Sequence, residues 1–304
     1  MKVIPIVPRG YCKGVVRAIN IAKKHANDHD QVTILGMIVH NQYIVDALDK
    51  MNIKTIDKKG ATREELLDEV DSGKIIITAH GASQAVMEKA VNKGLEVIDA
   101  TCLDVIKTHD LISKYLDDDY HVLYIGKNGH PESQGALSIN YQKIHLIETK
   151  ADIDKLDNHY KYVITNQTTM SLYDVYDLCQ YAKEKLSNVV IAKETCNATK
   201  IRQEAIASLD ESIDVVFIVG DPHSNNTKKL ASIASDKAHK TTYMISSVND
   251  ITIDMLKDKQ TAGVSSGAST PTYLTNQVID YLKQFDINDT NTYSCPTIEL
   301  DKII

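Results

Sequence analysis

Short runs of apolar and β-branched residues alternate with amphipathic stretches along most of the chain. Such continuous apolar runs are typical of strands buried on both faces, as in parallel sheets, and the stretches between them have the helical period. They predict strands at 32–35, 74–78, 121–125, 162–165, 215–219 and 262–265, and helices at 15–27, 83–93, 104–116, 171–186, 200–209 and 272–283. Strand and helix in regular alternation predict an α/β fold with mostly parallel sheets.

A repeated spacing divides the chain into three similar parts. Cys12, Cys102 and Cys196 are each followed 28 residues later by a polar residue, and each series ends in another polar residue after a strand. The two later residues of each series are His40 and His80, His130 and Thr168, and Ser224 and Ser269. We therefore predict three tandem α/β pseudo-repeats around a pseudo-threefold axis. The predicted units are 13–102, 103–196, and 197–284 with the N-terminal strand 1–12, followed by a C-terminal surface tail at 285–304.

Composition and charge narrow the class of protein. The chain of 304 residues is 43% hydrophobic and 25% charged, as in ordinary globular proteins. A net charge of −7 disfavours a nucleic-acid-binding protein, which usually carries a basic face. The N-terminus lacks the pattern of a signal peptide, and no apolar run is long enough for a membrane helix. A cytoplasmic protein without a membrane partner is expected.

The five cysteines point to a metal rather than to disulfides, because their number is odd and they are widely spread. Cys179 lies on an apolar helical stripe and is predicted to be a core residue, while Cys295 lies in the tail. The other three would converge if the repeats surround one axis. Structural zinc sites use closely spaced cysteine pairs, which this chain lacks, whereas an iron-sulfur cluster with three cysteine ligands suits this pattern and leaves one iron open. The alternative for each cysteine is a buried structural thiol.

Polar residues at equivalent positions form a second predicted ring. They are hydrogen-bond donors, and Asn41 and Ser83 stand where helices are expected to begin, adding backbone N–H groups. Such a ring suits a diphosphate, although each residue alone could be a helix cap. The members of this ring are His40, His80, His130, Thr168, Ser224, Asn226 and Ser269.

Glu132 is the candidate proton donor, because it follows the ring residue His130 by two positions. The alternative is a glutamate that only complements a helix dipole. The chain lacks the glycine-rich dinucleotide motif, the Walker loop, the metalloprotease His-Glu-x-x-His and the hydrolase Gly-x-Ser-x-Gly. Their absence disfavours nicotinamide, ATP and the common hydrolase sites.

Several motifs together resemble one known family. They are Pro8-Arg9-Gly10-Tyr11-Cys12, Ile38-Val39-His40-Asn41, Ala79-His80-Gly81-Ala82-Ser83, Asp99-Ala100-Thr101-Cys102, Gly129-His130-Pro131-Glu132, Gln167-Thr168-Thr169, Thr195-Cys196-Asn197-Ala198-Thr199 and Gly267-Ala268-Ser269. With them the chain resembles, nearly end to end, the 4-hydroxy-3-methylbut-2-enyl diphosphate reductases, the last enzymes of the non-mevalonate isoprenoid route.

The resemblance implies a cofactor, a substrate and residue roles. Cys12, Cys102 and Cys196 would ligate a [4Fe-4S] cluster whose fourth iron, not held by the protein, meets the substrate hydroxyl; in air the cluster would become [3Fe-4S] or be lost. Glu132 would supply protons and Thr168 would contact the hydroxyl end. The diphosphate would be held by His40, His80, His130, Ser224, Asn225, Asn226 and Ser269.

The implied reaction adds two electrons and two protons to an allylic diphosphate, expels water, and yields isopentenyl and dimethylallyl diphosphates. A ferredoxin or flavodoxin would supply the electrons.

The chain departs from the family pattern at Leu103, where proline is usual, at Asn225, where serine is common, and at Lys13, where a small residue is frequent. None of these departures removes a cluster ligand.

Two other functions are compatible with the residues. One is a three-cysteine iron-sulfur dehydratase or a quinolinate-synthase-like enzyme, in which the anchored group would be a carboxylate. The other is a non-catalytic anion-binding or redox-sensing protein, against which Glu132 and Thr168 argue. Turnover without an electron source would favour the dehydratase, and no turnover of any diphosphate would favour the sensor.

Overall fold

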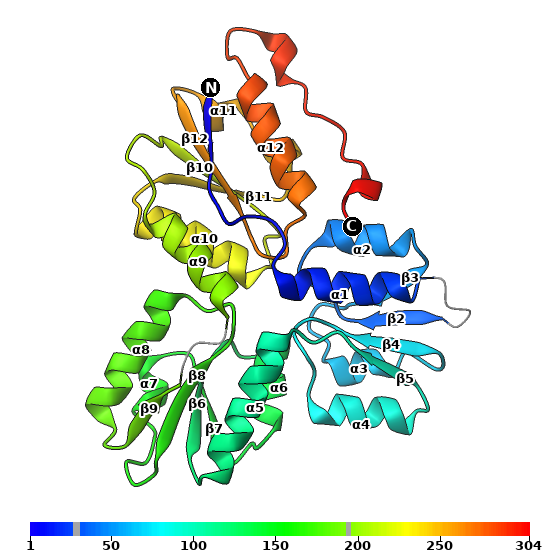
Figure 1. Cartoon of the computed structure of the whole chain (residues 1–304), viewed down its shortest axis with the longest axis vertical. Helices are drawn as coiled ribbons and strands as arrows, with labels where there is room; N and C mark the ends of the chain where they lie inside the picture. Colours follow the sequence, from blue (N-terminus) through cyan, green and yellow to red (C-terminus); the bar gives the residue numbers. More distant parts are fainter. Residues whose placement is uncertain (27–30, 193–195) are drawn as a thin grey trace. The chain divides into compact units, whose positions relative to one another are not determined.

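The computed structural model describes residues 1–26, 31–192 and 196–304. Within these residues the strands pair in parallel and form three four-stranded sheets (Figure 1). In spatial order, sheet A is β1 (Lys2–Pro5), β12 (Thr261–Ser266), β10 (Val215–Val219) and β11 (Thr241–Ile245); sheet B is β3 (Ile53–Ile56), β2 (Val32–Leu35), β4 (Lys74–Ile77) and β5 (Glu96–Asp99); sheet C is β7 (Ile144–Ile147), β6 (His121–Ile125), β8 (Tyr162–Asn166) and β9 (Val189–Ile191).

Helices connect the strands, as parallel pairing requires, because the chain must cross back over the sheet before each new parallel strand. They are α1 (Lys13–Lys24), α2 (Gln42–Asp49), α3 (Arg63–Leu67), α4 (Gln84–Asn92), α5 (Leu103–Asp117), α6 (Pro131–Ser138), α7 (Lys150–Ile153), α8 (Leu172–Lys185), α9 (Asn197–Ala207), α10 (Asn225–Asp236), α11 (Ile253–Leu256) and α12 (Thr272–Gln284), with short 3-10 helices η1 (Val248–Asp250), η2 (Thr290–Tyr293) and η3 (Leu300–Lys302). The predicted α/β class with three parallel sheets is confirmed.

The bounds of some predicted elements need correction. The first helix begins at Lys13, directly after Cys12, and ends at Lys24, while the predicted end at Asn27 lies outside the described residues. The helix predicted at 200–209 begins at Asn197 and ends at Ala207. Five strands, namely β3, β5, β7, β9 and β11, were not predicted.

Contacts between Cα atoms divide the described chain into two compact units. The first contains residues 1–16, 39–50 and 198–304, and therefore sheet A. The second contains residues 17–38 and 51–197, and therefore sheets B and C.

Sheet C of the second unit is buried on both faces. Leu123 and Ile125 pack in one cluster, which includes residues of α8, whereas Val122 and Tyr124 pack in another, which includes residues of α5 and α6. Successive side chains of a strand point to opposite faces, so β6 needs apolar residues at nearly every position. Cys179 of α8 is only 4% exposed in the first cluster, which confirms the prediction that it is a core residue.

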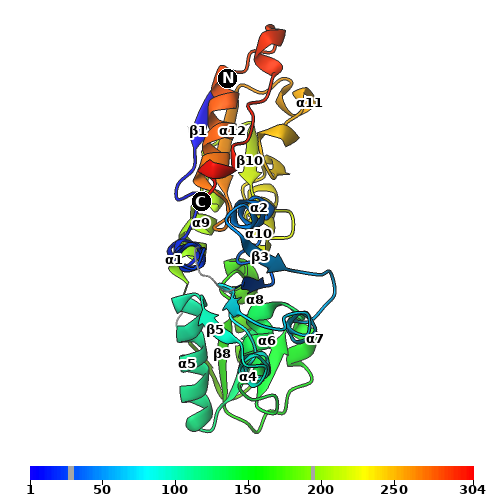
Figure 2. The same cartoon turned by 90° about the vertical axis from the view of Figure 1, so that its right-hand side faces the viewer.

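The C-terminal segment of the first unit runs back along α12 (Figures 1 and 2). The Gln277 side chain of α12 donates to the Thr297 carbonyl at 3.0 Å, and the Tyr11 hydroxyl donates to the Ile303 carbonyl at 2.8 Å. Ile303 is 2% exposed. The tail predicted to lie on the surface therefore contains η2 and η3, and its end is anchored.

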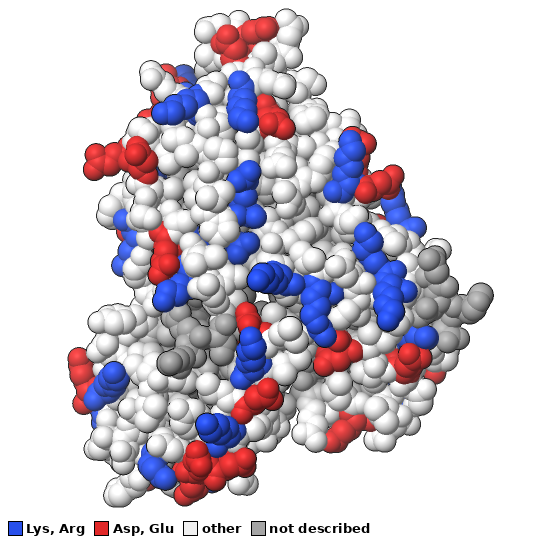
Figure 3. All heavy atoms as spheres, viewed as in Figure 1, with Lys and Arg blue, Asp and Glu red and all other residues white. Residues whose placement is uncertain are grey.

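Charged side chains of both signs are interspersed on the face shown in Figure 3. In the described chain some charged side chains form close pairs, such as Lys143 with Asp119 at 2.7 Å. Exposed pairs of this kind add little stability. Among the described residues, none of the helices combines the length and the apolar character that crossing a membrane requires.

Candidate active site

The predicted site residues follow strands in the same manner in all three sheets. His40, His130 and Ser224 each lie five residues beyond the last residue of β2, β6 or β10, which explains the repeated spacing. The strands of sheet A are followed by Cys12, Ser224 and Ser269, those of sheet B by Cys102, His40 and His80, and those of sheet C by Cys196, His130 and Thr168. Ligands of parallel sheets bind beyond the carboxyl ends of strands, so these positions are suited to binding.

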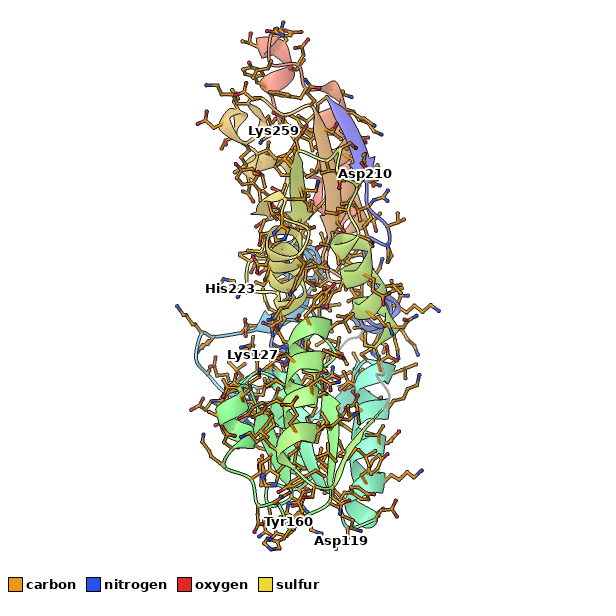
Figure 4. The ribbon with its side chains drawn as sticks, turned by 90° about the vertical axis from the view of Figure 1, so that its left-hand side faces the viewer. Asp119, Lys127, Tyr160, Asp210, His223 and Lys259 are labelled. Atoms are coloured by element: carbon orange, nitrogen blue, oxygen red, sulfur yellow. The ribbon has the colours of Figure 1, made fainter. Side chains whose placement is uncertain are left out.

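Figure 4 separates the two ends of sheet C. Lys127, just after β6, lies at the carboxyl ends of the strands, whereas Asp119 and Tyr160, just before β6 and β8, lie at the opposite end. The predicted residues of this sheet follow its strands and therefore belong to the Lys127 end.

Main-chain hydrogen bonds fix two of the cysteines. In the first unit the Cys12 N–H donates to the Ala268 carbonyl at 3.0 Å, and in the second the Cys102 N–H donates to the Ala79 carbonyl at 2.9 Å. The two acceptors immediately precede the ring residues Ser269 and His80. Each cysteine is thus held next to a predicted substrate residue of its own unit.

Each predicted cluster cysteine directly precedes a helix. The helices α1, α5 and α9 begin at the residue after Cys12, Cys102 and Cys196. The N-terminal end of a helix favours negative charge, which suits a thiolate ligand of a metal. All three residues are half-buried, and no disulfide joins any cysteine of the described chain. The donor set therefore fits an iron-sulfur cluster.

Leu103 follows Cys102, at a position where the family resemblance led us to expect proline. It is the first residue of α5, and its side chain is 54% exposed. Proline suits a first helical position because the N–H there lacks a partner within the helix, but proline is not required. Leucine is therefore compatible with this position, and the Cys102 N–H donates to the Ala79 carbonyl.

Glu132 and Thr168 form the best-defined polar pair of the second unit. Glu132, in the first turn of α6, is 1% exposed. Its Oε1 accepts a hydrogen bond from the Thr168 N–H at 2.7 Å, and its Oε2 accepts one from Thr168 Oγ1 at 3.0 Å. The sequence placed both residues near the reaction but did not predict that they bond to each other.

Burial raises the pKa of Glu132 to about 7, from an ordinary value of 4.5, although the Thr168 backbone and hydroxyl and Tyr124 oppose this rise. Desolvation disfavours the carboxylate more than these donors favour it. A carboxyl group with this pKa holds its proton in a large fraction of molecules near neutral pH. Glu132 is therefore equipped to act as a general acid.

The same pKa predicts how stability depends on pH. Because the folded state holds the Glu132 proton more tightly than the unfolded state, the free energy of unfolding falls as pH rises between about 4.5 and 7. The shift corresponds to about 3 kcal/mol. Glu132→Gln does not titrate, so we expect it to gain up to about this amount over the wild type between about pH 5 and pH 8. Urea unfolding of both proteins at the two pH values measures the gain; a constant difference would refute the raised pKa.

Two predicted substrate histidines meet in the second unit. The rings of His80 and His130 pack edge to face, with centroids 5.3 Å apart. His130 caps α6, where its Nδ1 accepts a hydrogen bond from the Glu132 N–H at 3.2 Å. Its other ring nitrogen, Nε2, is the one suited to donate to an anion when protonated. The histidine pair and the acid thus occupy adjacent positions.

The first unit brings Ser224, Asn226 and Ser269 into the buried part of sheet A and α10. Ser224 caps α10, and Asn226 is 3% exposed. Neither polar atom of the Asn226 amide has a hydrogen-bond partner among the described residues. A buried amide without partners is costly, and an anion with several acceptor oxygens would satisfy its donor. Ser269 Oγ donates to the His40 carbonyl at 3.1 Å, and Asn225 opens α10.

Two supporting residues had no role predicted from the sequence. Gln167 Oε1 accepts hydrogen bonds from the Lys127 N–H at 3.0 Å and Ser133 Oγ at 3.3 Å, joining the loop after β6 to the loop that carries Thr168. Tyr124 lies beneath Glu132 in the core of sheet C. The only signals were a glutamine beside Thr168 and a hydroxyl within an otherwise apolar strand.

A separate pocket of about 160 Å³ opens in the second unit. Among the described residues, its lining includes Arg63, Tyr141 and Ser83, which was predicted to add a backbone N–H group, but none of the predicted cluster ligands or ring residues. The Arg63 guanidinium already donates to the Gly81 carbonyl and the Thr78 hydroxyl. We therefore do not assign the substrate to this pocket.

Comparisons of this chain with known proteins all point to the same family. A family model described as LytB protein matches residues 3–283. A 4-hydroxy-3-methylbut-2-enyl diphosphate reductase of Geobacillus kaustophilus is 48% identical over 297 residues, which cover 96% of this chain and 93% of that protein. The enzyme of the same name from Macrococcus caseolyticus is 44% identical over 311 residues, and the match covers 100% of this chain and 96% of that protein.

Solved structures agree with the sequence relatives. The Plasmodium falciparum E-1-hydroxy-2-methyl-but-2-enyl-4-diphosphate reductase has a TM-score of 0.85 at 28% identity, covering 99% of this chain and 96% of that one. A structure of (E)-4-hydroxy-3-methyl-but-2-enyl diphosphate reductase, the terminal enzyme of the non-mevalonate pathway, has a TM-score of 0.66 at 28% identity and covers 94% and 100%.

Proposed function

The chain belongs to the LytB protein family, and we propose that it is a reductase that removes the hydroxyl group of 4-hydroxy-3-methylbut-2-enyl diphosphate. The observation that carries this proposal is the buried acid Glu132, held by Thr168 and next to a histidine pair. An anion binder would not need a buried carboxyl group with a pKa of about 7. A reductive dehydroxylation needs an acid to protonate the departing oxygen.

We assign the cluster to Cys12, Cys102 and Cys196. Each precedes a helix, each is half-buried, and each occupies the same place relative to its sheet. When bound, a [4Fe-4S] cluster with one iron not held by the protein supplies electrons and Lewis-acid chemistry at the substrate hydroxyl. A ferredoxin or flavodoxin is the proposed source of these electrons.

The diphosphate is assigned to the histidines and to the polar residues of α10 and the β12 loop. His80 and His130 supply ring N–H donors, and the unpartnered amide of Asn226 supplies another. Charge-assisted hydrogen bonds of this kind are strong, and they would orient the substrate for the reaction. The full proposed set is His40, His80, His130, Ser224, Asn225, Asn226 and Ser269.

The proposed step breaks the carbon–oxygen bond. Glu132 gives its proton to the hydroxyl oxygen, which leaves as water, while Thr168 holds the carboxyl group in place. Two electrons and a second proton then complete a new carbon–hydrogen bond, so the reaction consumes two electrons and two protons. The carbon that receives the second proton decides between isopentenyl and dimethylallyl diphosphate.

The first experiment is anaerobic reconstitution with iron and sulfide, followed by an assay with dithionite-reduced viologen and 4-hydroxy-3-methylbut-2-enyl diphosphate. We expect both five-carbon diphosphates to form and viologen to be oxidised, with two electrons consumed per product. A protein that assembles a cluster but leaves this substrate untouched would instead be tested as a dehydratase on hydroxy acids without reductant. A protein that turns over neither substrate would refute the proposed activity.

A further inference from the structure

Tyr124 is a buried polar residue that the proposed reaction does not use. It lies in β6, the central strand between β7 and β8, and its side chain is fully buried. The other side chains of β6 after His121 are aliphatic. A tyrosine hydroxyl buried without a partner costs free energy, so its neighbours are informative.

The backbone nearby leaves space for this ring. A Cβ atom on Gly126 would lie 2.8 Å from Tyr124 Cε1 and 2.6 Å from Ser133 Oγ, which is too close for either contact. Ser133 directly follows Glu132 in α6. The glycine therefore allows the ring to pack against the first turn of the helix that carries the acid.

The Tyr124 hydroxyl lies close enough to the Glu132 carboxyl group for each to shift the pKa of the other. Burial, followed by the charge of Glu132, raises the pKa of Tyr124 well above its ordinary value. The phenol consequently keeps its proton at all relevant pH values. Among the described residues, no group makes a hydrogen bond of regular geometry with this hydroxyl. Glu132 nevertheless influences Tyr124 at hydrogen-bonding range, so the hydroxyl lies beside this carboxyl group, which is 1% exposed, without a fully formed bond to it.

We propose that Tyr124 is a positioning residue whose hydroxyl donates a hydrogen bond to the Glu132 carboxylate once Glu132 has given its proton to the substrate, an inference that rests on the proposed function. Thr168 already supplies two donors to this carboxyl group. Tyr124 would be the third. A donor that acts mainly on the ionised form makes Glu132 a stronger acid, because it stabilises the product of proton transfer.

Two titratable groups on other elements lie near Glu132. His130 bonds to its main-chain N–H, and His80 packs against His130. Neither histidine lies on β6. The effect of Tyr124 is therefore separable from that of the histidines by a substitution that removes a single oxygen atom.

The test compares Tyr124→Phe with Tyr162→Phe in the reconstituted enzyme. Tyr162 lies in the same sheet and is equally buried, but its hydroxyl donates to the Asp157 carbonyl at 2.6 Å. One readout is the pH dependence of kcat/KM. The other is the infrared band of the protonated Glu132 carboxyl group, identified by its loss in Glu132→Gln.

We expect Tyr124→Phe to move the infrared titration of Glu132 upward by about one pH unit, since the variant loses a donor that favours the ionised carboxylate. The alkaline limb of kcat/KM should move by the same amount, with a lower plateau, while Tyr162→Phe should leave both unchanged. An unshifted titration in folded Tyr124→Phe would overturn the proposal. A lower rate at every pH with no shift would do the same, because it indicates only a packing role.

A second variant covers the case in which Tyr124→Phe folds poorly. Site-specific 3-fluorotyrosine at position 124 keeps the ring and makes the phenol a better donor, so the Glu132 titration should move downward. No movement would overturn the proposal. The infrared titration requires no turnover, so a protein inactive on the proposed substrate still tests Tyr124 independently of the proposed function.

Discussion

Glu132→Gln should lower kcat by about 10²–10⁴-fold while leaving the fold and the cluster content intact. The amide keeps the size of the side chain and an oxygen that accepts the Thr168 N–H, which donates to Glu132 at 2.7 Å. It cannot deliver an acidic proton to the leaving oxygen. The measurement is kcat and KM under reducing anaerobic conditions, normalised to iron content.

Glu148→Gln is a matched control, because Glu148 also accepts a main-chain hydrogen bond, from Asn128 at 3.1 Å, but lies near the surface. It should retain wild-type activity. If Glu132→Gln retained more than about a tenth of the wild-type rate at equal iron content, another group would have to supply the proton, because general acids contribute at least about 10²-fold.

Cys102→Ser should prevent assembly of a complete cluster and abolish turnover. Serine retains the main-chain bond to the Ala79 carbonyl, so the loop stays in place, but its hydroxyl is a poor ligand for iron compared with a thiolate. Iron and sulfide per chain and the visible absorption after anaerobic reconstitution measure the effect. Activity with dithionite and viologen measures the consequence.

Cys295→Ser is the control for this substitution. The Cys295 thiol donates to the Val248 carbonyl at 3.5 Å, a bond that a serine hydroxyl can also make, and it lies far along the chain from the predicted ligands. We expect normal iron content and activity. A Cys102→Ser protein with as much iron as the control would remove Cys102 from the ligand set.

The sequence predicted the central strands better than the edge strands, and the reason is burial. β2, β6 and β10 are almost fully buried and apolar, so their runs are unambiguous. The edge strand β5 has glutamate and aspartate at its two ends, where only part of the surface is covered. Because of these two polar residues, β5 does not form a recognisable apolar run in the sequence.

The site was predictable as positions along the chain but not as contacts. The repeated spacing was visible because His40, His130 and Ser224 each lie five residues beyond the end of their strand. The bonds from Thr168 to Glu132, and the position of the Tyr124 hydroxyl, depend on how α6 packs on β6 and on where the loop after β8 lies. A tyrosine in an apolar strand gives the same sequence pattern whether its hydroxyl has no role or lies beside an acid.

The cysteines Cys12 and Cys102 are secured by their own main-chain N–H groups rather than by the side chains beside them. Peptide groups are the same in every residue, so mutation of a neighbouring side chain leaves these bonds in place. Leu103 and Lys13, the first residues of α5 and α1, are both exposed, so a change of either side chain would not disturb these bonds. The side chains next to these cysteines can therefore vary, whereas the carbonyl groups of Ala79 and Ala268 must keep their positions to accept the two hydrogen bonds.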